Sequence, residues 1–252
     1  MTVPDGATPA AISAARPTPM GRWWLRNRWD DLTFVHLAYA PEVVQALLPD
    51  GLRVDTLDGM AYVSLVPFEM NQATPRFVPP IPWISSFAET NVRTYVVDSA
   101  GNRAVWFFSL EADRLAIVVF ARWLLGFPYV WSRLTVEGEA GRRRYVTESR
   151  RWPKRPRSIT DVTIEIGDEI DAPSELDAFL TARWGTVVQW PRRRGRLRHH
   201  PVDHPEWRIH EATLVDHHDE SFVAAGLPEP TGTPIVRWVD GIDAWFGRPT
   251  RV

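Results

Sequence analysis

The 252-residue chain contains no cysteine, which excludes disulfide bonds, thiolate chemistry and metal sites built on cysteine. Proteins without disulfides are typical of reducing compartments, so we expect a cytoplasmic location. Lysine is nearly absent too, because Lys154 stands alone beside 28 arginines. Any chemistry that needs a lysine amine therefore has a single candidate residue.

The chain also lacks a strong net charge and a long apolar run. A formal net charge of −2 argues against general binding to nucleic acids or membrane surfaces. The longest apolar run, residues 115–125, is interrupted by Arg122 and is far shorter than the roughly 20 residues of a membrane span. Residues 1–20 have no cationic start and no apolar core, unlike a secretory signal. We expect a disordered tail there, followed by one domain over residues 21–252.

Short alternating or apolar segments, separated by turn residues, fill most of the chain. We predict strands over residues 31–39, 60–68, 87–98, 103–112, 158–167, 186–190, 195–200 and 210–217, with a further hairpin around Ala140-Gly141. About ten strands joined mostly as hairpins predict a mainly antiparallel sheet. So many strands in one domain curl or close. We therefore predict a mainly β (α+β) fold, a closed β-barrel that has an interior.

A few short peripheral helices and one proline-rich loop complete the predicted fold. Helix patterns occur over residues 41–52, 113–126, 174–185 and 219–227. Asp113 and Ser174 are predicted N-caps, with Asp177 completing a capping box in the helix over residues 174–185. Gly126 is a predicted stop. Residues 74–83 are rich in proline, which cannot donate to a strand ladder, so we expect a loop there.

One predicted strand, "FAETNVRTYVV", places its polar side chains on a single face: Glu89, Asn91, Arg93 and Tyr95. A hairpin with its turn at Ala100-Gly101 predicts the opposing residues: Trp106 against Tyr95, Phe108 against Arg93, and Leu110 against Asn91. A face meant only for water does not usually continue into Trp and Phe. We therefore expect this face to look into the barrel interior.

Three segments, "FAETNVRTYVV", "FFSLEA" and "ARWLLGFPY", resemble in this order the uncharacterised YqjF-like family of the acetoacetate decarboxylase-like superfamily. "LLPDGLRVDTLDGMAYVSLVPFEM" and "GIDAWFG" are similar as well, so the resemblance covers most of residues 23–250. The resemblance implies a closed, cone-shaped, mostly antiparallel β-barrel with a cavity, and commonly a homo-oligomer.

The enzyme that names the superfamily removes CO₂ from a β-keto acid. As the resemblance implies, a lysine in a Gly-aromatic-Pro-Lys-Lys segment forms a Schiff base, helped by a strand glutamate and an arginine. Glu89 matches that glutamate, Arg122 matches that arginine, and residues 126–128 match the approach to the lysines. Tyr129 and Val130 occupy the two lysine positions. A Schiff base needs a primary amine, so we do not expect an imine-forming decarboxylase.

Lys154 is not a plausible replacement, because it lies in the arginine- and proline-rich "RRWPKRPRS", which we expect to be an exposed loop. The predicted site comprises three catalytic residues, Glu89, Tyr129 and Arg122, and five substrate-binding residues, Arg93, Asn91, Tyr95, Trp106 and Phe108. A partly buried carboxyl can act as acid or base near neutral pH. Arginine can hold a carboxylate, and a tyrosine hydroxyl can donate to an oxyanion.

These groups predict a protein that binds a small carbonyl or carboxylate compound and acts on it without a cofactor, as a lyase, hydratase or isomerase would. Two alternatives remain open. The barrel would bind a small molecule without catalysis, or it would be filled, with Glu89 in a structural ion pair, in an assembly role. Whether the protein is an enzyme is therefore undecided by the sequence.

Other polar residues have plainer interpretations. The late histidines match no HExxH motif and are interrupted by prolines, so we expect no metal site at His199, His200, His204, His210, His217 and His218. His36 is predicted to be a hydrogen-bonded core histidine, and Glu111 to be solvated. The basic stretches 142–157 and 191–198 are expected to be solvated rather than to bind phosphate.

Overall fold

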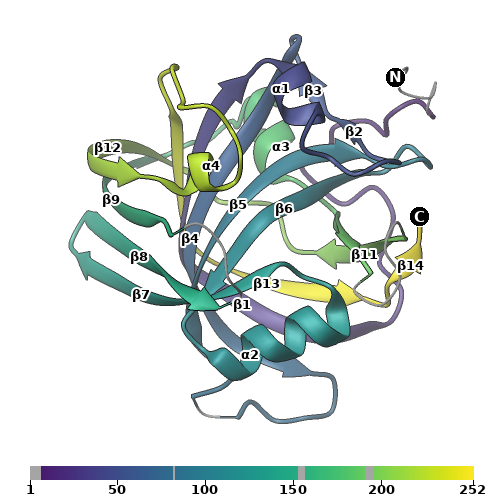
Figure 1. The fold of residues 1–252 in the computed structure, drawn as a ribbon, viewed down its shortest axis with the longest axis horizontal. Coiled ribbons are helices and arrows are strands. Elements are labelled where there is room, and N and C mark those ends of the chain that lie inside the picture. Colours follow the sequence, from purple (N-terminus) through teal and green to yellow (C-terminus); the bar gives the residue numbers. More distant parts are fainter. Residues whose placement is uncertain (1–6, 82, 153–156, 191–195) are drawn as a thin grey trace.

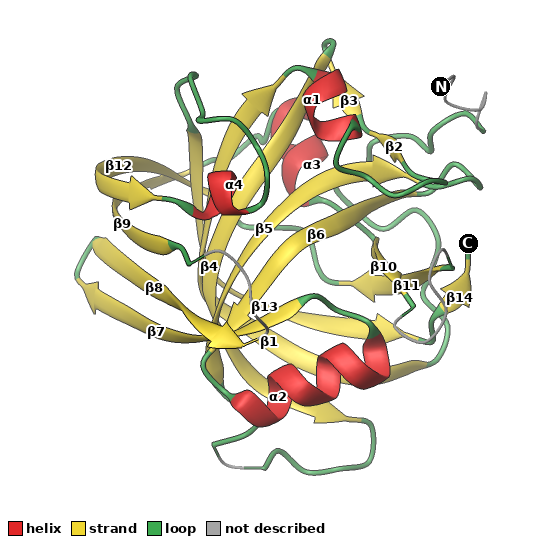
Figure 2. Ribbon diagram, viewed as in Figure 1, coloured by secondary structure: helices red, strands yellow, loops and turns green. Residues whose placement is uncertain are grey.

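The computed structural model describes residues 7–81, 83–152, 157–190 and 196–252 (Figure 1). Within these ranges the chain forms fourteen strands: β1 (Trp23–Tyr39), β2 (Arg53–Val54), β3 (Thr56–Leu57), β4 (Met60–Pro75), β5 (Phe87–Val97), β6 (Arg103–Ala112), β7 (Tyr129–Glu139), β8 (Arg142–Trp152), β9 (Ile159–Glu169), β10 (Gly185–Gln189), β11 (Leu197–Asp203), β12 (His210–Asp219), β13 (Ile235–Gly247) and β14 (Thr250–Arg251). The helices are short: α1 (Pro41–Gln45), α2 (Leu115–Phe120), the π-helix η1 (Ala121–Leu125), α3 (Glu175–Thr181) and α4 (Ser221–Ala224). Strands dominate, as predicted (Figure 2).

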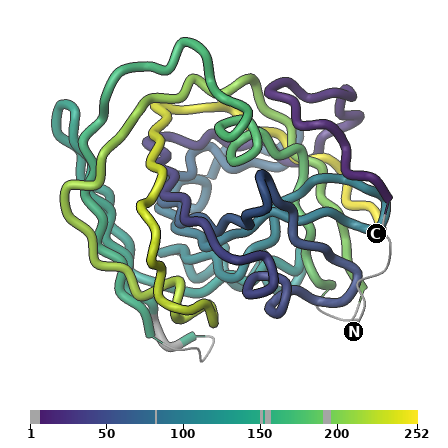
Figure 3. The backbone as a smooth tube through the Cα atoms, turned by 90° about the horizontal axis from the view of Figure 1, so that it is seen from above, coloured from purple at the N-terminus to yellow at the C-terminus, as the bar shows by residue number. Residues whose placement is uncertain are grey.

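All these strands belong to one sheet, which closes on itself. Its order is β14-β11-β10-β6-β7-β8-β9-β12-β13-β1-β4-β5-β2, and the extra pairings β5–β6 and β11–β13 close it. Neighbouring strands run antiparallel except β6 with β7 and β6 with β10. The predicted closed and mainly antiparallel fold is confirmed. Seen from above, the backbone runs round in a ring (Figure 3).

Because of these extra pairings the strands form two closed rings. Both rings contain the five neighbouring strands β13-β1-β4-β5-β6, which we call the shared wall. One ring continues through β7, β8, β9 and β12, and the other through β10 and β11. Alternation sends successive side chains to opposite faces of the wall. Val92 of β5 packs with Tyr145 of β8 in one hydrophobic core, whereas Val66 and Phe68 of β4 belong to a second cluster.

The sequence prediction missed one long strand, β13, and the two-residue strands β2, β3 and β14. The β13 segment contains Gly241, and glycine is unusual within a strand. Gly241 pairs with Asp30 of β1, and a Cβ at this position would lie 2.3 Å from the Asp30 carboxyl oxygen. The Asp30 carboxylate therefore lies over the glycine, in space that a larger residue could take only if the Asp30 side chain moved. β4 also runs further than predicted, because Pro75 still pairs with Leu25 at its end.

The β5–β6 hairpin is confirmed, but its register contains a bulge that we did not predict. Asn91 faces Leu110 as expected, and the register then shifts between Val92 and Arg93. Two predicted pairs are wrong by one residue: Arg93 faces Phe107 rather than Phe108, and Tyr95 faces Val105 rather than Trp106. An extra residue on one strand changes which of its side chains share a face with the partner.

The helices agree with the predictions in place more than in length. Ser174 and Asp177 form the predicted capping box of α3, which ends at Thr181 because Gly185 already begins β10. Gly126, at φ 85°, ends the helical segment as predicted, although its last turn is π-helical. Asp113 is not the cap of α2, since Arg114 occupies that position without a side-chain cap.

Helix α1 is shorter than the 41–52 prediction. The side chain of Gln45 donates to the Leu52 carbonyl and accepts from the Val54 amide, which turns the chain into β2. None of the helices formed by the described residues has the length and apolarity that crossing a bilayer requires.

Residues 7–20, which we expected to be a disordered tail, lie against the sheet. The Ala10 amide donates to the Gly101 carbonyl at 2.9 Å, and Arg103 donates to the Ala10 carbonyl at 2.7 Å. Trp184 donates to the Ser13 carbonyl at 3.3 Å. These contacts correct the expectation of a tail for this part of the segment.

Candidate functional site

A cavity of about 460 Å³ lies on the face of the shared wall that is enclosed by β10, β11 and α2. Its lining comes from β1, β4, β5, β6, β7, β10, β11 and β13, with α2, η1 and the connection from β4 to β5. Small-molecule sites are typically about 300–1,000 Å³. The alternative of a filled barrel is therefore wrong for this side of the wall.

The mouth of the cavity is apolar. The exposed lining residues belong to two neighbouring segments: Pro75, Val78, Pro79, Ile81, Ala116 and Phe120. The other lining residues in the described ranges are buried or half-buried. The opening therefore lies between α2 and the connection from β4 to β5, which occupy the same end of the molecule (Figure 2).

Glu89 and Tyr129 meet inside this cavity. Glu89 is 3% exposed, and the Tyr129 hydroxyl donates to its Oε2 atom at 2.5 Å. Burial raises the pKa of Glu89 to about 7, against the lowering effect of side-chain hydrogen bonds with Tyr129 and Asn91. Burial and the Glu89 charge raise the pKa of Tyr129 well above its usual value. Glu89 can therefore gain or lose a proton near neutral pH, while Tyr129 stays protonated.

Local structure explains why Tyr129 reaches Glu89. The left-handed Gly126 lets the chain leave η1 and turn toward the sheet. Tyr129 then begins β7 and pairs with Leu110 of β6, which itself pairs with Asn91 of β5. The residue at the expected lysine position is thus presented to the strand that carries the glutamate.

Arg93 lies in the same lining, further along β5. Its Nε and Nη2 atoms are buried and find no hydrogen-bond partner in the described ranges. Arg183, which follows α3, also lines the cavity and has an unpartnered Nη2 atom. Buried charged groups left without partners are costly. The deep part of the cavity is therefore chemically suited to an anion.

Further polar lining atoms lack partners within the described residues: Asn27 Oδ1, Trp29 Nε1 and Asn91 Oδ1. Sequence reasoning identified Asn91 and missed the other two. In "LRNRWDD" arginines flank Asn27, so this segment lacks the alternation of polar and apolar residues that singled out residues 89–95. Nothing in the sequence near Arg183 indicates that it reaches this cavity.

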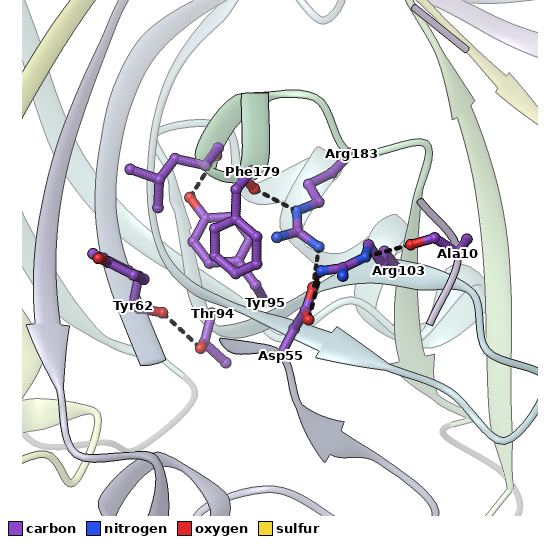
Figure 4. Close-up of polar contacts among 9 residues, drawn as sticks. Ala10, Asp55, Tyr62, Thr94, Tyr95, Arg103, Phe179 and Arg183 are labelled. Atoms are coloured by element: carbon purple, nitrogen blue, oxygen red, sulfur yellow. Dashed lines mark hydrogen bonds and ion pairs between the residues drawn. The ribbon is translucent and has the colours of Figure 1, made fainter. Parts of the chain in front are cut away.

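Several predicted binding residues lie elsewhere. Tyr95 is fully buried beneath α3, where its hydroxyl donates to the Leu180 carbonyl at 2.6 Å (Figure 4). Phe108 packs against the core on the opposite face of the wall, and Trp106 packs with Val187. For the two β6 residues the bulge is the reason, because it brings Val105 and Phe107 to the cavity instead.

Arg122 is placed beside the site rather than in its lining. Its Nη1 atom donates to the Tyr129 backbone carbonyl at 2.6 Å, and its guanidinium lies 5.9 Å from the Trp152 ring centroid. The carbonyl belongs to the same residue whose hydroxyl binds Glu89. This geometry favours a positioning role for Arg122 over direct contact with a ligand.

His204 is a lining residue that the sequence reasoning treated as ordinary. Its Nδ1 lies 2.7 Å from the Pro205 carbonyl, an acceptor, so Nδ1 carries the proton and Nε2 is an acceptor. Burial lowers the pKa of His204 to about 4, so the ring is neutral near pH 7. Within the described ranges no three His, Cys, Asp or Glu side chains are placed to hold a metal ion.

The remaining predictions have mixed outcomes. His36 is a buried core histidine as predicted, with Nδ1 2.6 Å from Ser64 Oγ. Glu111 is not solvated: it is 7% exposed and accepts a hydrogen bond from Ser132. Of the basic stretches, residues 142–152 form β8, whereas Lys154 and residues 191–195 lie outside the described residues.

Comparisons with known proteins agree with this architecture. The chain is 28% identical over 229 residues to the uncharacterized protein YqjF of Bacillus subtilis (strain 168), covering 90% of this chain and 92% of that one. An acetoacetate decarboxylase-like enzyme from Sphingomonas wittichii RW1 superposes with a TM-score of 0.62 at 17% identity, covering 98% of both chains.

The enduracididine biosynthesis enzyme MppR, solved in complex with pyruvate, superposes with a TM-score of 0.59 at 14% identity, covering 97% of this chain and 98% of that one. At such identities the structural likeness establishes the fold, which is of the acetoacetate decarboxylase type, and confirms that part of the resemblance. Residues 26–243 match the family DUF2071, described as an uncharacterized conserved protein, and the chain belongs to that family.

Proposed function

We propose that the cavity binds a small carbonyl or carboxylate compound and that Glu89 performs acid/base chemistry on it. The observation that carries the proposal is a buried carboxyl group in a cavity, with a pKa of about 7 and a tyrosine hydroxyl at 2.5 Å. A general base or acid works best when its pKa lies near the working pH.

The two side chains have complementary roles in this proposal. Ionised Glu89 takes a proton from the carbon next to a substrate carbonyl, and the electron pair of that C–H bond forms an enolate. Tyr129 turns its hydroxyl from Glu89 to the enolate oxygen and stabilises the negative charge. Return of the proton from Glu89 to another carbon completes an isomerase-type step. In a hydratase- or lyase-type step the enolate electron pair forms a C=C bond as the C–O bond on the next carbon breaks, and the departing hydroxyl takes the proton from Glu89 and leaves as water.

Arg93 supplies the attraction for an anionic substrate, because its unpartnered N–H groups match a carboxylate. The pyruvate complex of MppR supports oxo acids as the first compounds to test. Tyr129 cannot form a Schiff base, so the proposed chemistry proceeds without one.

A binding protein without catalysis is the second candidate. The predominance of apolar side chains among the lining residues favours it, since a cavity built mainly for affinity needs few polar groups.

The two candidates differ in proton exchange. Ligands are first found by thermal shift with short oxo and hydroxy acids, because binding to the folded state raises the melting temperature. The bound oxo acid is then followed by NMR in D₂O. We expect exchange of the hydrogens next to its carbonyl, slowed by about 100-fold or more in Glu89→Gln, with binding retained.

The matched control is Glu137→Gln, because Glu137 is exposed on β7 and is absent from the cavity lining. Equal exchange in Glu89→Gln and the wild type would remove Glu89 from the mechanism. Binding without exchange would support the binding protein instead. Borohydride with the oxo acid should leave the protein mass unchanged, and a trapped adduct would contradict the imine-free chemistry.

A further inference from the structure

We propose that the ligand of this cavity is an elongated amphipathic carboxylate rather than a three-carbon acid. Its carboxylate lies at the deep end beside Arg93 and Arg183, its reactive carbon lies beside Glu89 and Tyr129, and its apolar chain extends to the mouth. The inference rests on the proposed function and adds the substrate class and the direction of binding.

The deep end of the cavity carries an excess of positive charge. The guanidinium carbons of Arg93 and Arg183 lie 5.8 and 4.6 Å from the same ring, that of Tyr95. Asp55 is already shared by Arg183 and Arg103, at 2.6 Å from each (Figure 4). Arg103 and Arg183 therefore share one carboxylate, while Arg93 and Arg183, which line the cavity, keep N–H groups without partners in the described ranges. A second carboxylate, from a ligand, would complete this arrangement.

The reactive groups lie at some distance from this anion site. Glu89 and Arg93 are four residues apart on one face of β5, which corresponds to about 13 Å along a strand. Asn91 lies between them, with its Oδ1 atom unpartnered. Even if both long side chains lean toward each other, several bonds must separate the ligand's carboxylate from the carbon beside Glu89.

From Glu89 outward the lining becomes apolar. The next inward-facing residue of β5 is Phe87, which pairs with Met70 of β4. Beyond them lie the six exposed apolar residues of the mouth. A hydrocarbon chain would bury against these surfaces, and each buried methylene raises affinity by up to about fourfold.

A series of straight-chain carboxylates tests the inference on the wild-type protein. Dissociation constants are measured by calorimetry for propionate, hexanoate and decanoate, with 1-decanol as the uncharged match to the longest. We expect affinity to rise by about tenfold or more from propionate to decanoate. We also expect decanoate to bind more tightly than 1-decanol. Equal affinities for propionate and decanoate, or for decanoate and 1-decanol, would overturn the inference.

Variants of the lining residues test where the two ends of the ligand lie, beginning with its carboxylate. Arg93→Gln should weaken decanoate binding by about tenfold or more and leave 1-decanol binding unchanged. Arg133→Gln, at an exposed position, should change neither affinity. Arg183→Lys keeps a positive charge next to Asp55 but removes the planar fork and the hydrogen bond to the Phe179 carbonyl, so it should weaken decanoate binding in a variant that still folds. Unchanged decanoate affinity in a folded Arg183→Lys variant would remove Arg183 from the anion site.

The mouth is tested by Ala116→Trp, which places a large ring on an exposed lining position of α2. This substitution should weaken decanoate binding and leave propionate binding unchanged. Val119→Trp is the matched control, since Val119 is exposed on the same helix and is absent from the lining. Equal effects of the two tryptophans on decanoate would contradict the proposed orientation.

Failure of the chain-length inference can be distinguished from failure of the proposed function. If short oxo acids bind and exchange hydrogens through Glu89 while decanoate does not bind, only the chain-length inference falls. If no carboxylate of any length binds, the proposed function falls with it.

Discussion

The two faces of the shared wall use neighbouring residues of the same strand in opposite ways. On the filled face, Val92 packs in the core and Thr90 pairs with Thr147 at 2.8 Å. On the hollow face, Asn91 and Arg93 keep buried polar atoms without partners in the described ranges. Along β5, therefore, the polar side chain that faces the filled side is paired within the protein, and the polar side chains that face the cavity keep atoms available to a ligand.

Two buried tyrosines sharpen this comparison. Tyr145 of β8 accepts from Thr33 and donates to the Asp31 carbonyl at 2.7 Å, so its hydroxyl is committed to the protein. Tyr129 donates to a carboxyl group inside the cavity. One hydroxyl stabilises the fold, and the other is available to a ligand if Glu89 releases it.

The largest effect is expected from truncation on the filled face. Ile164→Ala removes a fully buried side chain and should lower the free energy of unfolding by about 2–5 kcal/mol. Ile117→Ala, at a half-buried lining position, should cost about 1 kcal/mol or less, because the cavity already exists. Chemical denaturation measures both, and equal losses would break the distinction between the two faces.

The next effect is the pH dependence contributed by Glu89. Its pKa is raised to about 7 in the folded state, so the folded state holds a proton that the unfolded state releases above its ordinary pKa. This contribution to stability is full below pH 4.5 and is lost as pH rises to about 7, by about 3 kcal/mol at most.

Glu89→Gln removes this loss, so the variant should become more stable than the wild type above pH 7. Denaturation at pH 5 and pH 8 measures the difference. A wild-type stability that rises between these values, with no change in the difference between wild type and variant, would show that Glu89 is ordinarily ionised.

A smaller effect is expected from removing the hydroxyl groups of the two buried tyrosines, Tyr145 and Tyr129. Tyr145→Phe leaves a buried hydroxyl and a carbonyl without their partner, so it should lower the free energy of unfolding by about 1–2 kcal/mol. Tyr129→Phe removes a hydrogen bond that lowers the pKa of Glu89, so that pKa should rise further. Carbon-13 NMR titration of the glutamate measures it, and a downward shift in Tyr129→Phe would contradict the hydrogen-bond geometry.

The smallest effect is expected at Arg93. Arg93→Met replaces a buried, incompletely paired guanidinium by an apolar chain of similar length, which should leave stability unchanged or raise it by about 1 kcal/mol. Thermal denaturation without ligand checks this. A loss above about 2 kcal/mol would mean that Arg93 is a structural residue, like those of the filled face.

The sequence predicted the β5–β6 hairpin and the capping box of α3, since each depends on residues close together in the chain. The closed antiparallel sheet was predicted from the number of strands and from the family resemblance, and not from any local pattern that shows which distant strands pair. The contact between Glu89 and Tyr129 was reached only through a family resemblance, because forty positions separate them. Arg183, Asn27 and His204 were missed for the same reason: their neighbours in the chain carry no signal about the distant strand they face.

What the sequence determined by itself is the periodicity of β5. A two-residue repeat places Glu89, Asn91 and Arg93 on one face whatever the rest of the chain does. Tertiary structure decided what that face meets. Closure of the sheet created the hollow, and the bulge on β6 turned Phe107 toward it and Phe108 away, because strand register is set by pairings between distant segments.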